Sequence, residues 1–336
     1  MLAEKYLKSN VFVLMAGTLL SQLLPFLISP ILTRLYTPEE FGTFGLYFSI
    51  SMIISVFITG RYEMAIILPK SDNASANVVG LSLLITVVVS AAVFLITIFL
   101  KHSIAILFNS DRIENILFLL PLTMLAIGSY QTFNYWNNRK EHYKRLAVSS
   151  VARSVSSSAA SVAFGFTSFK AFGLIVGDTI GQLIASFFLF IRTWRNDKTI
   201  FKGITKKGMR EQALRYQHFP KFNVASGLSE KLSGHIPVLM LSGFFGEAIT
   251  GLFSLSQRIV AAPGAIIARA VGDVFRKQAT VEYQVNGNCI ALFNKTFRQL
   301  TFLGFMPFSV FSFLRLNYFH FCLVKSGKWP GITHAS

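Results

Sequence analysis

Apolar runs of about 20 residues recur along this chain. Residues 41–60, FGTFGLYFSISMIISVFITG, contain no charged side chain. A helix of roughly 20 apolar residues crosses the hydrocarbon core of a bilayer, and in lipid it satisfies its own backbone hydrogen bonds. Eight windows reach this length and a ninth is slightly shorter, which predicts an all-α polytopic membrane protein with about nine transmembrane helices. The windows lie near residues 11–35, 38–60, 78–100, 114–136, 147–169, 171–193, 222–245, 248–270 and 297–314.

The composition excludes a soluble globular domain. Only 14% of the residues are charged and 52% are hydrophobic, whereas soluble domains carry roughly 25% charged residues. The net charge of +17 would suggest a nucleic-acid partner if it covered one face. The cations instead lie between the apolar runs, so no nucleic-acid binding is expected. Cys289 and Cys322 have neither disulfide-framework nor metal-site spacing, and no metal is expected.

The loops predict the orientation of the chain. Alternate loops place 22 Lys and Arg on one side of the membrane and four on the other. Lysine and arginine are retained in cytoplasmic loops, so the N-terminus is predicted to be cytoplasmic. The first apolar run is too long for a signal peptide and has no small-residue cleavage site, so we expect it to stay as the first helix.

A long basic connection divides the predicted helices. We expect a first six-helix bundle over residues 1–193, a cytoplasmic linker over 194–221 with an interfacial helix on anionic lipid, and an incomplete second bundle over 222–313. Residues 314–336 lose the helix pattern. The halves echo each other, because PFLISPILTRLYTPEEFGTFGLYFS and IPVLMLSGFFGEAITGLFS both read as an apolar helix, an acidic turn and a new helix. Six helices separate them, which predicts a parallel repeat.

Several ionisable residues interrupt the apolar runs. Each costs about 2.5 to 3.5 kcal/mol at mid-membrane on insertion scales, so each should face protein or water. The candidate site residues are Arg153, Asp178, Glu230, Lys231 and Arg258, with Arg61 and Glu63 at the end of the second helix.

Each candidate has a functional and a structural interpretation. Arg258 lies about ten residues into the eighth run, too deep for easy snorkelling, and is our first candidate for a substrate contact. Asp178 is either a structural partner or a site that binds a coupling ion. Lys231 is either a cavity cation or half of an interfacial pair with Glu230. Arg61 and Glu63 either form a plain helix-end pair or border a cavity entrance.

The fifth and sixth runs are rich in small residues. The fifth, AVSSVARSVSSSAASVAFGFTSF, carries Arg153 among eight serines. Serines allow either close helix packing or a wet cavity, and Arg153 favours the cavity because its charge needs hydration. Gly173, Gly177 and Gly181 form a ridge in the sixth run that favours close helix packing.

Enzyme motifs are missing from the sequence. It has no HExxH, GxSxG or P-loop motif, and its six histidines are scattered. We therefore expect no catalytic residues and no enzymatic activity.

Four segments resemble those of a known family, the polysaccharide flippases for O-antigen and similar lipid-linked repeat units, in the superfamily that also holds multidrug extruders. The resemblance covers nearly all of residues 10–310. It implies two six-helix halves around a central cationic cavity that opens alternately to either side. The segments are LTRLYTPEEFGTFGLY, GRYEMAIILPKSDNAS, SQRIVAAPGAIIARAVGDVF and LGFMPFSV.

The resemblance implies translocation of a polyprenyl-diphosphate-linked oligosaccharide across the bacterial inner membrane. Arginine suits the diphosphate because its planar fork binds phosphate oxygens bidentately, so Arg258, Arg153 and Lys231 are the expected cavity cations and Asp178 the expected site for coupling H⁺ or Na⁺. No cofactor is expected. Further implied partners are membrane lipid, a polysaccharide polymerase and chain-length proteins.

Two other functions stay open at this stage. A multidrug antiporter of the same superfamily would need acidic residues facing the cavity, and here the intramembrane cations outnumber Asp178. A membrane glycosyltransferase or acyltransferase is the third alternative. The chain departs from the family in length, because its second half stops after three helices; we expect an open reading frame interrupted near residue 313.

Overall fold

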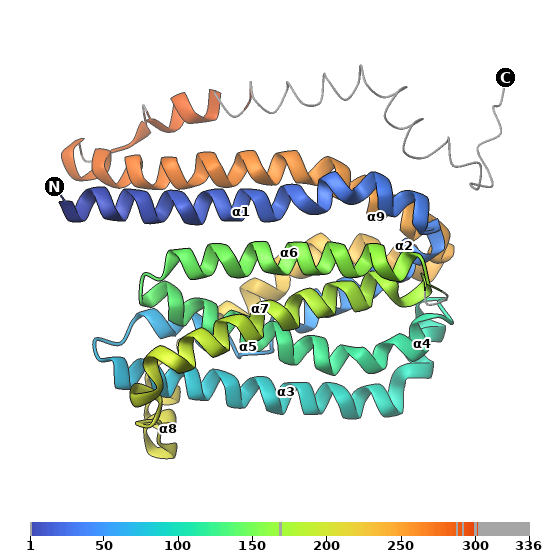
Figure 1. Cartoon of the computed structure of the whole chain (residues 1–336), viewed down its shortest axis with the longest axis horizontal. Coiled ribbons are helices and arrows are strands. Elements are labelled where there is room, and N and C mark those ends of the chain that lie inside the picture. Colours follow the sequence, from blue (N-terminus) through green and yellow to red (C-terminus); the bar gives the residue numbers. More distant parts are fainter. Residues whose placement is uncertain (1, 168–169, 287, 291, 299–300, 302–336) are drawn as a thin grey trace. The chain divides into compact units, whose positions relative to one another are not determined.

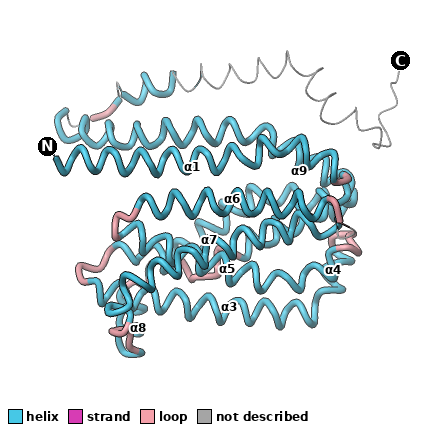
Figure 2. Tube along the Cα trace, in the orientation of Figure 1, coloured by secondary structure: helices cyan, strands magenta, loops and turns pink. Residues whose placement is uncertain are grey.

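The computed structural model describes residues 2–167, 170–286, 288–290, 292–298 and 301. In this part of the chain every regular element is a helix (Figures 1 and 2). The elements are α1 (Leu2–Leu35), α2 (Pro38–Ile54), η1 (Tyr62–Ile67), α3 (Asp72–Leu107), α4 (Ile113–Ile116), η2 (Leu117–Leu119), α5 (Leu120–Arg139), α6 (Tyr143–Gly165), α7 (Lys170–Phe201), α8 (Lys206–Arg215), the π-helical η3 (Phe219–Asn223) and α9 (Val224–Asn286).

Within the described residues, five helical segments are long and apolar enough to cross a membrane, which confirms the predicted all-α polytopic class. Helix α2 is shorter, with 17 residues, and α6 is the serine-rich run. The segments are Val13–Leu35, Asp72–Leu107, Ile113–Arg139, Phe172–Phe201 and Phe219–Arg258.

Two of the predicted windows, 222–245 and 248–270, lie in the single element α9, apart from residues 222–223, which end η3. A break separates them, because Gly246 has φ 78° and ψ −177° inside the helix. Such a positive φ favours glycine, which lacks a Cβ that would clash. The ninth window, 297–314, lies almost entirely outside the described residues, and the tail 314–336 lies wholly outside them.

The start of α2 has the cap that the sequence predicted. The Thr37 hydroxyl accepts a hydrogen bond from the Glu40 amide at 3.4 Å, and the Glu40 carboxylate accepts one from the Thr37 amide at 2.8 Å. Pro38 occupies the first helical position, where a missing amide proton costs nothing. An N-cap of this kind stabilises a helix by about 1 kcal/mol and fixes the tight turn after α1.

The chain divides into two compact units. The first comprises Met1–Ile28 and Leu35–Ser254, and the second Ser29–Arg34 and Leu255–Ser336. These units are defined by which residues pack against one another. The first unit contains the first part of α9 together with the first six predicted spans. The predicted functional halves, with boundaries at 193, 221 and 313, stay a prediction.

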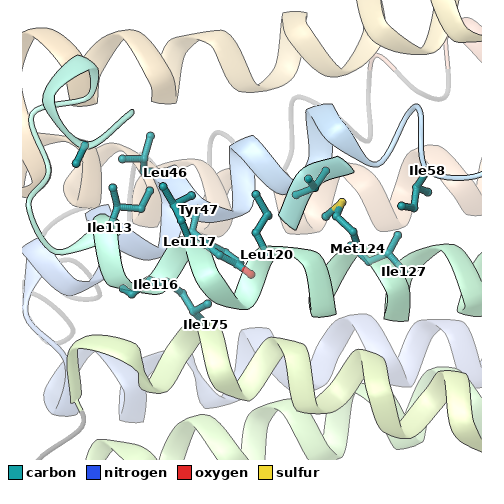
Figure 3. Close-up of a cluster of buried hydrophobic side chains, with 12 residues drawn as sticks. Leu46, Tyr47, Ile58, Ile113, Ile116, Leu117, Leu120, Met124, Ile127 and Ile175 are labelled. Atoms are coloured by element: carbon teal, nitrogen blue, oxygen red, sulfur yellow. The ribbon is translucent and has the colours of Figure 1, made fainter. Parts of the chain in front are cut away.

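The apolar core of the first unit lies where α2, α4, α5 and α7 meet (Figure 3). Leu46, Ile113, Met124 and Ile175 are each at most 1% exposed in this cluster. Figure 3 also shows Tyr47 of α2 reaching into it with its hydroxyl toward α5.

Hydroxyl groups join the same helices inside this core. The Tyr47 hydroxyl lies 2.7 Å from Thr123 Oγ1 of α5, and Thr123 Oγ1 lies 3.0 Å from Thr179 Oγ1 of α7. A buried hydroxyl without a partner would be costly in an apolar interior, so this chain of hydrogen bonds also fixes the register of the three helices.

Helices α6 and α7 pack closely through small residues. A Cβ added at Gly177 would overlap the Ser161 hydroxyl, and one at Gly181 would lie 2.7 Å from both the Arg153 carbonyl and Ser157 Cβ. The predicted packing role of this glycine ridge is confirmed. Part of the serine content of α6 is therefore explained by helix packing, as in other small-residue interfaces between membrane helices.

Candidate functional site

The predicted pair Arg61 and Glu63 lies just after α2, where Arg61 caps the start of η1 and Glu63 belongs to its first turn. Gly60 and Arg61 both have left-handed backbones, with φ 59° and 61°. Glu63 is only 2% exposed and accepts a hydrogen bond from the Thr59 hydroxyl. Arg61 Nη1 lies 3.9 Å from Glu63 Oε1. Burial raises the pKa of the Glu63 carboxyl, and the Thr59 hydrogen bond and the Arg61 charge only partly offset it.

The Arg61 side chain also contacts the beginning of α9. A Cβ added at Gly227 would overlap the Arg61 guanidinium, so glycine is what lets the two approach. Nearby, Asn223 Nδ2 lies 3.7 Å from Met64 Sδ. The pair is therefore more than a local helix-end contact, because it connects the α2–α3 turn to the seventh predicted span.

A second contact holds the other end of that span. Glu247, which follows the break at Gly246, accepts a hydrogen bond from the Ser110 hydroxyl and lies 3.8 Å from Arg112 Nε. The Ser242 hydroxyl also donates to the Phe108 carbonyl at 2.8 Å. We call Ser110, Arg112 and Glu247 the Glu247 contact. The first part of α9 is thus attached at both ends to the loops of the first unit.

The two repeated turns of the sequence meet at this same end. A Cβ at Gly42 would overlap the Glu247 carbonyl, and one at Gly251 would overlap the Pro38 carbonyl. The first turn of α2 and the turn after Gly246 are therefore in backbone contact. The similarity between the two halves of the sequence identified both turns, but it did not predict that they are in contact.

Arg153 and Asp178 lie on neighbouring helices of the first unit. The guanidinium carbon of Arg153 lies 5.9 Å from the ring centroid of Tyr130 on α5, and the adjacent Ser154 hydroxyl donates to the Ser21 carbonyl of α1. A cation stacked on an aromatic face is stabilised by roughly 0.5 to 2 kcal/mol. Asp178 is half-buried on α7, next to Thr179 of the hydroxyl chain.

Lys231 and Arg258 complete the predicted set. Lys231 Nζ lies 3.4 Å from Glu230 Oε1, as the pairing interpretation expects, and its side chain is 34% exposed. His235, one turn on, lies 3.2 Å from the Ser49 hydroxyl. Arg258 is half-buried and belongs to the second unit, whereas the other predicted residues belong to the first. Their convergence on one cavity stays a prediction.

A cavity of about 460 Å³ lies at the α5–α6 turn. We call it the cationic pocket, because Lys144, Arg145 and Arg192 contribute to its walls. None of the predicted site residues lines it. Part of this pocket is visible in the sequence as the basic run RKEHYKR. The run did not indicate a site, because a basic loop is already expected on the cytoplasmic side of a membrane protein. The full lining is Glu141, His142, Tyr143, Lys144, Arg145, Val148, Phe188 and Arg192.

The helices and these contacts define an α-helical integral membrane protein whose interior carries paired charges and hydroxyl chains. A family of polysaccharide biosynthesis proteins matches residues 31–322, and the chain belongs to this family. The comparisons with curated proteins and with solved structures gave no match.

Proposed function

We propose that this protein translocates a polyprenyl-diphosphate-linked oligosaccharide across the bacterial inner membrane by alternating access, for export of O-antigen or another surface polysaccharide. The family match over residues 31–322 is the observation that carries this proposal. Moving sugar hydroxyls through hydrocarbon without partners costs on the order of several kcal/mol each, so the glycan needs a polar route through the protein.

The contacts at the two ends of the 224–245 segment supply the moving parts in this proposal. Arg61 packs on Gly227 at one end, and the Glu247 contact holds the other. In alternating access, one of these two contacts breaks while the other stays closed, and the two then exchange roles. Both include charged groups, and Gly227 and Gly42 allow the close approach of the segments that meet there.

The roles of individual residues follow from their chemistry. Arg153, Lys231 and Arg258 would contact the diphosphate, arginine through its bidentate fork. Asp178 would bind the coupling H⁺ or Na⁺, as acids within transporters often do. Arg61 and Glu63 would border the cytoplasmic entrance, with the N-terminus in the cytoplasm.

A reconstituted assay tests the proposal. The purified chain is placed in vesicles with a fluorescent polyprenyl-diphosphate oligosaccharide, and the fraction of probe accessible to an external quencher is followed over time. Faster loss of protected probe than in protein-free vesicles supports translocation. An unchanged rate contradicts it. Release of free sugar or a new glycan product would indicate a transferase instead, and efflux of a cationic dye alone would indicate a drug antiporter.

A further inference from the structure

The cationic pocket combines three cations with a single carboxylate. Lys144 and Arg145 come from the first turn of α6 and Arg192 from the last third of α7, while Glu141 carries the opposing charge. Burial, and then the charge of the neighbouring Arg145, lower the pKa of His142 and so disfavour its charged form. The walls therefore favour an anion.

Arg145, which lines this pocket, has one guanidinium nitrogen without a hydrogen-bond partner among the described residues. Its Nη1 atom is buried and makes no hydrogen bond to any residue in the described part of the chain. A guanidinium has five N–H donors in a fixed plane, and a buried donor left without an acceptor is costly. Phosphate oxygens match the guanidinium fork in geometry and charge.

The remaining wall is apolar and faces outward. Val148 is 44% exposed, and Phe188 lies beneath the Arg192 guanidinium, whose central carbon is 5.7 Å from the ring centroid. A free inorganic anion would gain nothing from these two side chains. A lipid would, because its glycerol and first methylenes continue directly from its phosphate.

The position in the fold agrees with a lipid. The pocket lies where α5 ends at Arg139 and α6 begins at Tyr143, at an end of the membrane-crossing segments. Basic pockets between helix ends are common headgroup sites on the cytoplasmic side of membranes. The aromatic ring of Tyr143 in the lining is typical of the interfacial layer.

We propose that the pocket formed by Lys144, Arg145 and Arg192 binds the phosphate headgroup of a membrane lipid with a net negative charge, with Val148 and Phe188 against its apolar part. This site is separate from the predicted cavity residues, so it does not depend on the translocation proposal.

Native mass spectrometry of the full chain, purified in a mild detergent and titrated with phosphatidylglycerol, tests the site. The variant Arg145→Gln/Arg192→Gln removes two pocket charges. The control Lys70→Gln/Lys295→Gln removes two exposed charges outside both the pocket and the linker predicted to rest on lipid, so the net charge of the two variants is the same. We expect affinity to fall about fivefold per pocket cation, so about 25-fold for the first variant, with little change in the control.

Three results would overturn the proposal: equal losses in both variants, equal binding of phosphatidylcholine and phosphatidylglycerol, or stabilisation by inorganic phosphate as strong as that by the lipid. Arg145→Lys keeps a cation but loses the planar fork, so it should bind more tightly than Arg145→Gln and less tightly than wild type. The elution volume of each variant in size-exclusion chromatography checks folding. Competition by polyprenyl diphosphate identifies the source of the headgroup: displacement of phosphatidylglycerol assigns the site to the polyprenyl carrier, and no displacement assigns it to bulk phospholipid.

Discussion

Glu63 shows how one buried acid makes the α2–α3 turn sensitive to pH. Burial raises its pKa in the folded chain, so the folded state binds a proton that the unfolded state releases at lower pH. The resulting stabilisation is complete below the ordinary glutamate pKa of about 4.3 and is lost as pH rises through the folded value. Glu63→Gln removes this dependence.

We therefore expect the melting temperature of the wild-type protein, relative to Glu63→Gln, to fall as pH rises across that window. Thermal unfolding in detergent from about pH 4 to about pH 8 measures it, a range that starts near the ordinary glutamate pKa. Glu39→Gln, on the first turn of α2, serves as the control. Parallel curves for wild type and Glu63→Gln would show that the carboxyl titrates normally.

Gly227 tests the contact between the same turn and α9. Gly227→Val places a branched side chain where the Arg61 guanidinium lies, so the flexible end of Arg61 must move away from α9. Because an arginine side chain can move, we expect a loss at or below the lower end, about 1 kcal/mol, of the cost of overpacking a core. Gly234→Val is the matched control, because nothing in the structure lies within 4 Å of a Cβ at Gly234. Equal melting temperatures for the two variants would contradict the contact.

At the scale of elements, the Glu247 contact ties the loop after α3 to the break in α9. Arg112 is 47% exposed and Glu247 only 13%, so the pair is partly screened by solvent and contributes about 0.2 to 1 kcal/mol. Arg112→Glu should increase labelling of a cysteine placed at Ser242 by a membrane-impermeant maleimide. The charge swap Arg112→Glu/Glu247→Arg should restore protection, whereas labelling that stays high in the swap would rule out an ionic role.

The α6–α7 interface depends on the absence of side chains along one ridge. Gly177→Leu would overlap the Ser161 hydroxyl and the backbone of α6, and helix packing in the first unit should lose about 1 to 3 kcal/mol. Ile184→Leu introduces the same side chain at an exposed position of α7 and serves as the control. Denaturant unfolding followed by tryptophan fluorescence compares the two variants, and a Gly177→Leu variant as stable as Ile184→Leu would refute close packing.

At the scale of the whole molecule, the translocation proposal assigns contacts with the diphosphate to Arg153 and Arg258. Arg258→Ala and Arg153→Ala should each lower surface polysaccharide in complemented cells by at least about tenfold if each supplies one charge-assisted contact of about 1.5 to 3 kcal/mol to the diphosphate. Arg195→Ala, which removes an exposed cation of α7, should leave the polysaccharide unchanged. Immunoblotting must show equal protein in the membrane. An undiminished polysaccharide level in Arg258→Ala would remove that residue from the mechanism.

Sequence alone determined the class of this protein, the cap of α2 and the packing ridge of α7. These features depend on local chemistry: length and apolarity set a membrane span, a capping box is closed within a single helical turn, and glycines at every fourth position share one helix face. The break near Glu247 was also visible as an acidic turn between two apolar runs.

Tertiary structure decided which distant groups meet. Arg61 and Gly227, Ser110 and Glu247, and Arg145 and Arg192 are far apart in the chain, and no periodicity specifies their pairing. The charge of the basic loops was enough to predict the orientation of the chain in the membrane. Only the packing of α6 on α7 brings three of these cations together around a cavity. The physical reason is that an apolar side chain is stabilised by burial against any apolar neighbour. A charged side chain is stabilised by a particular partner, and the fold decides which partner lies within reach.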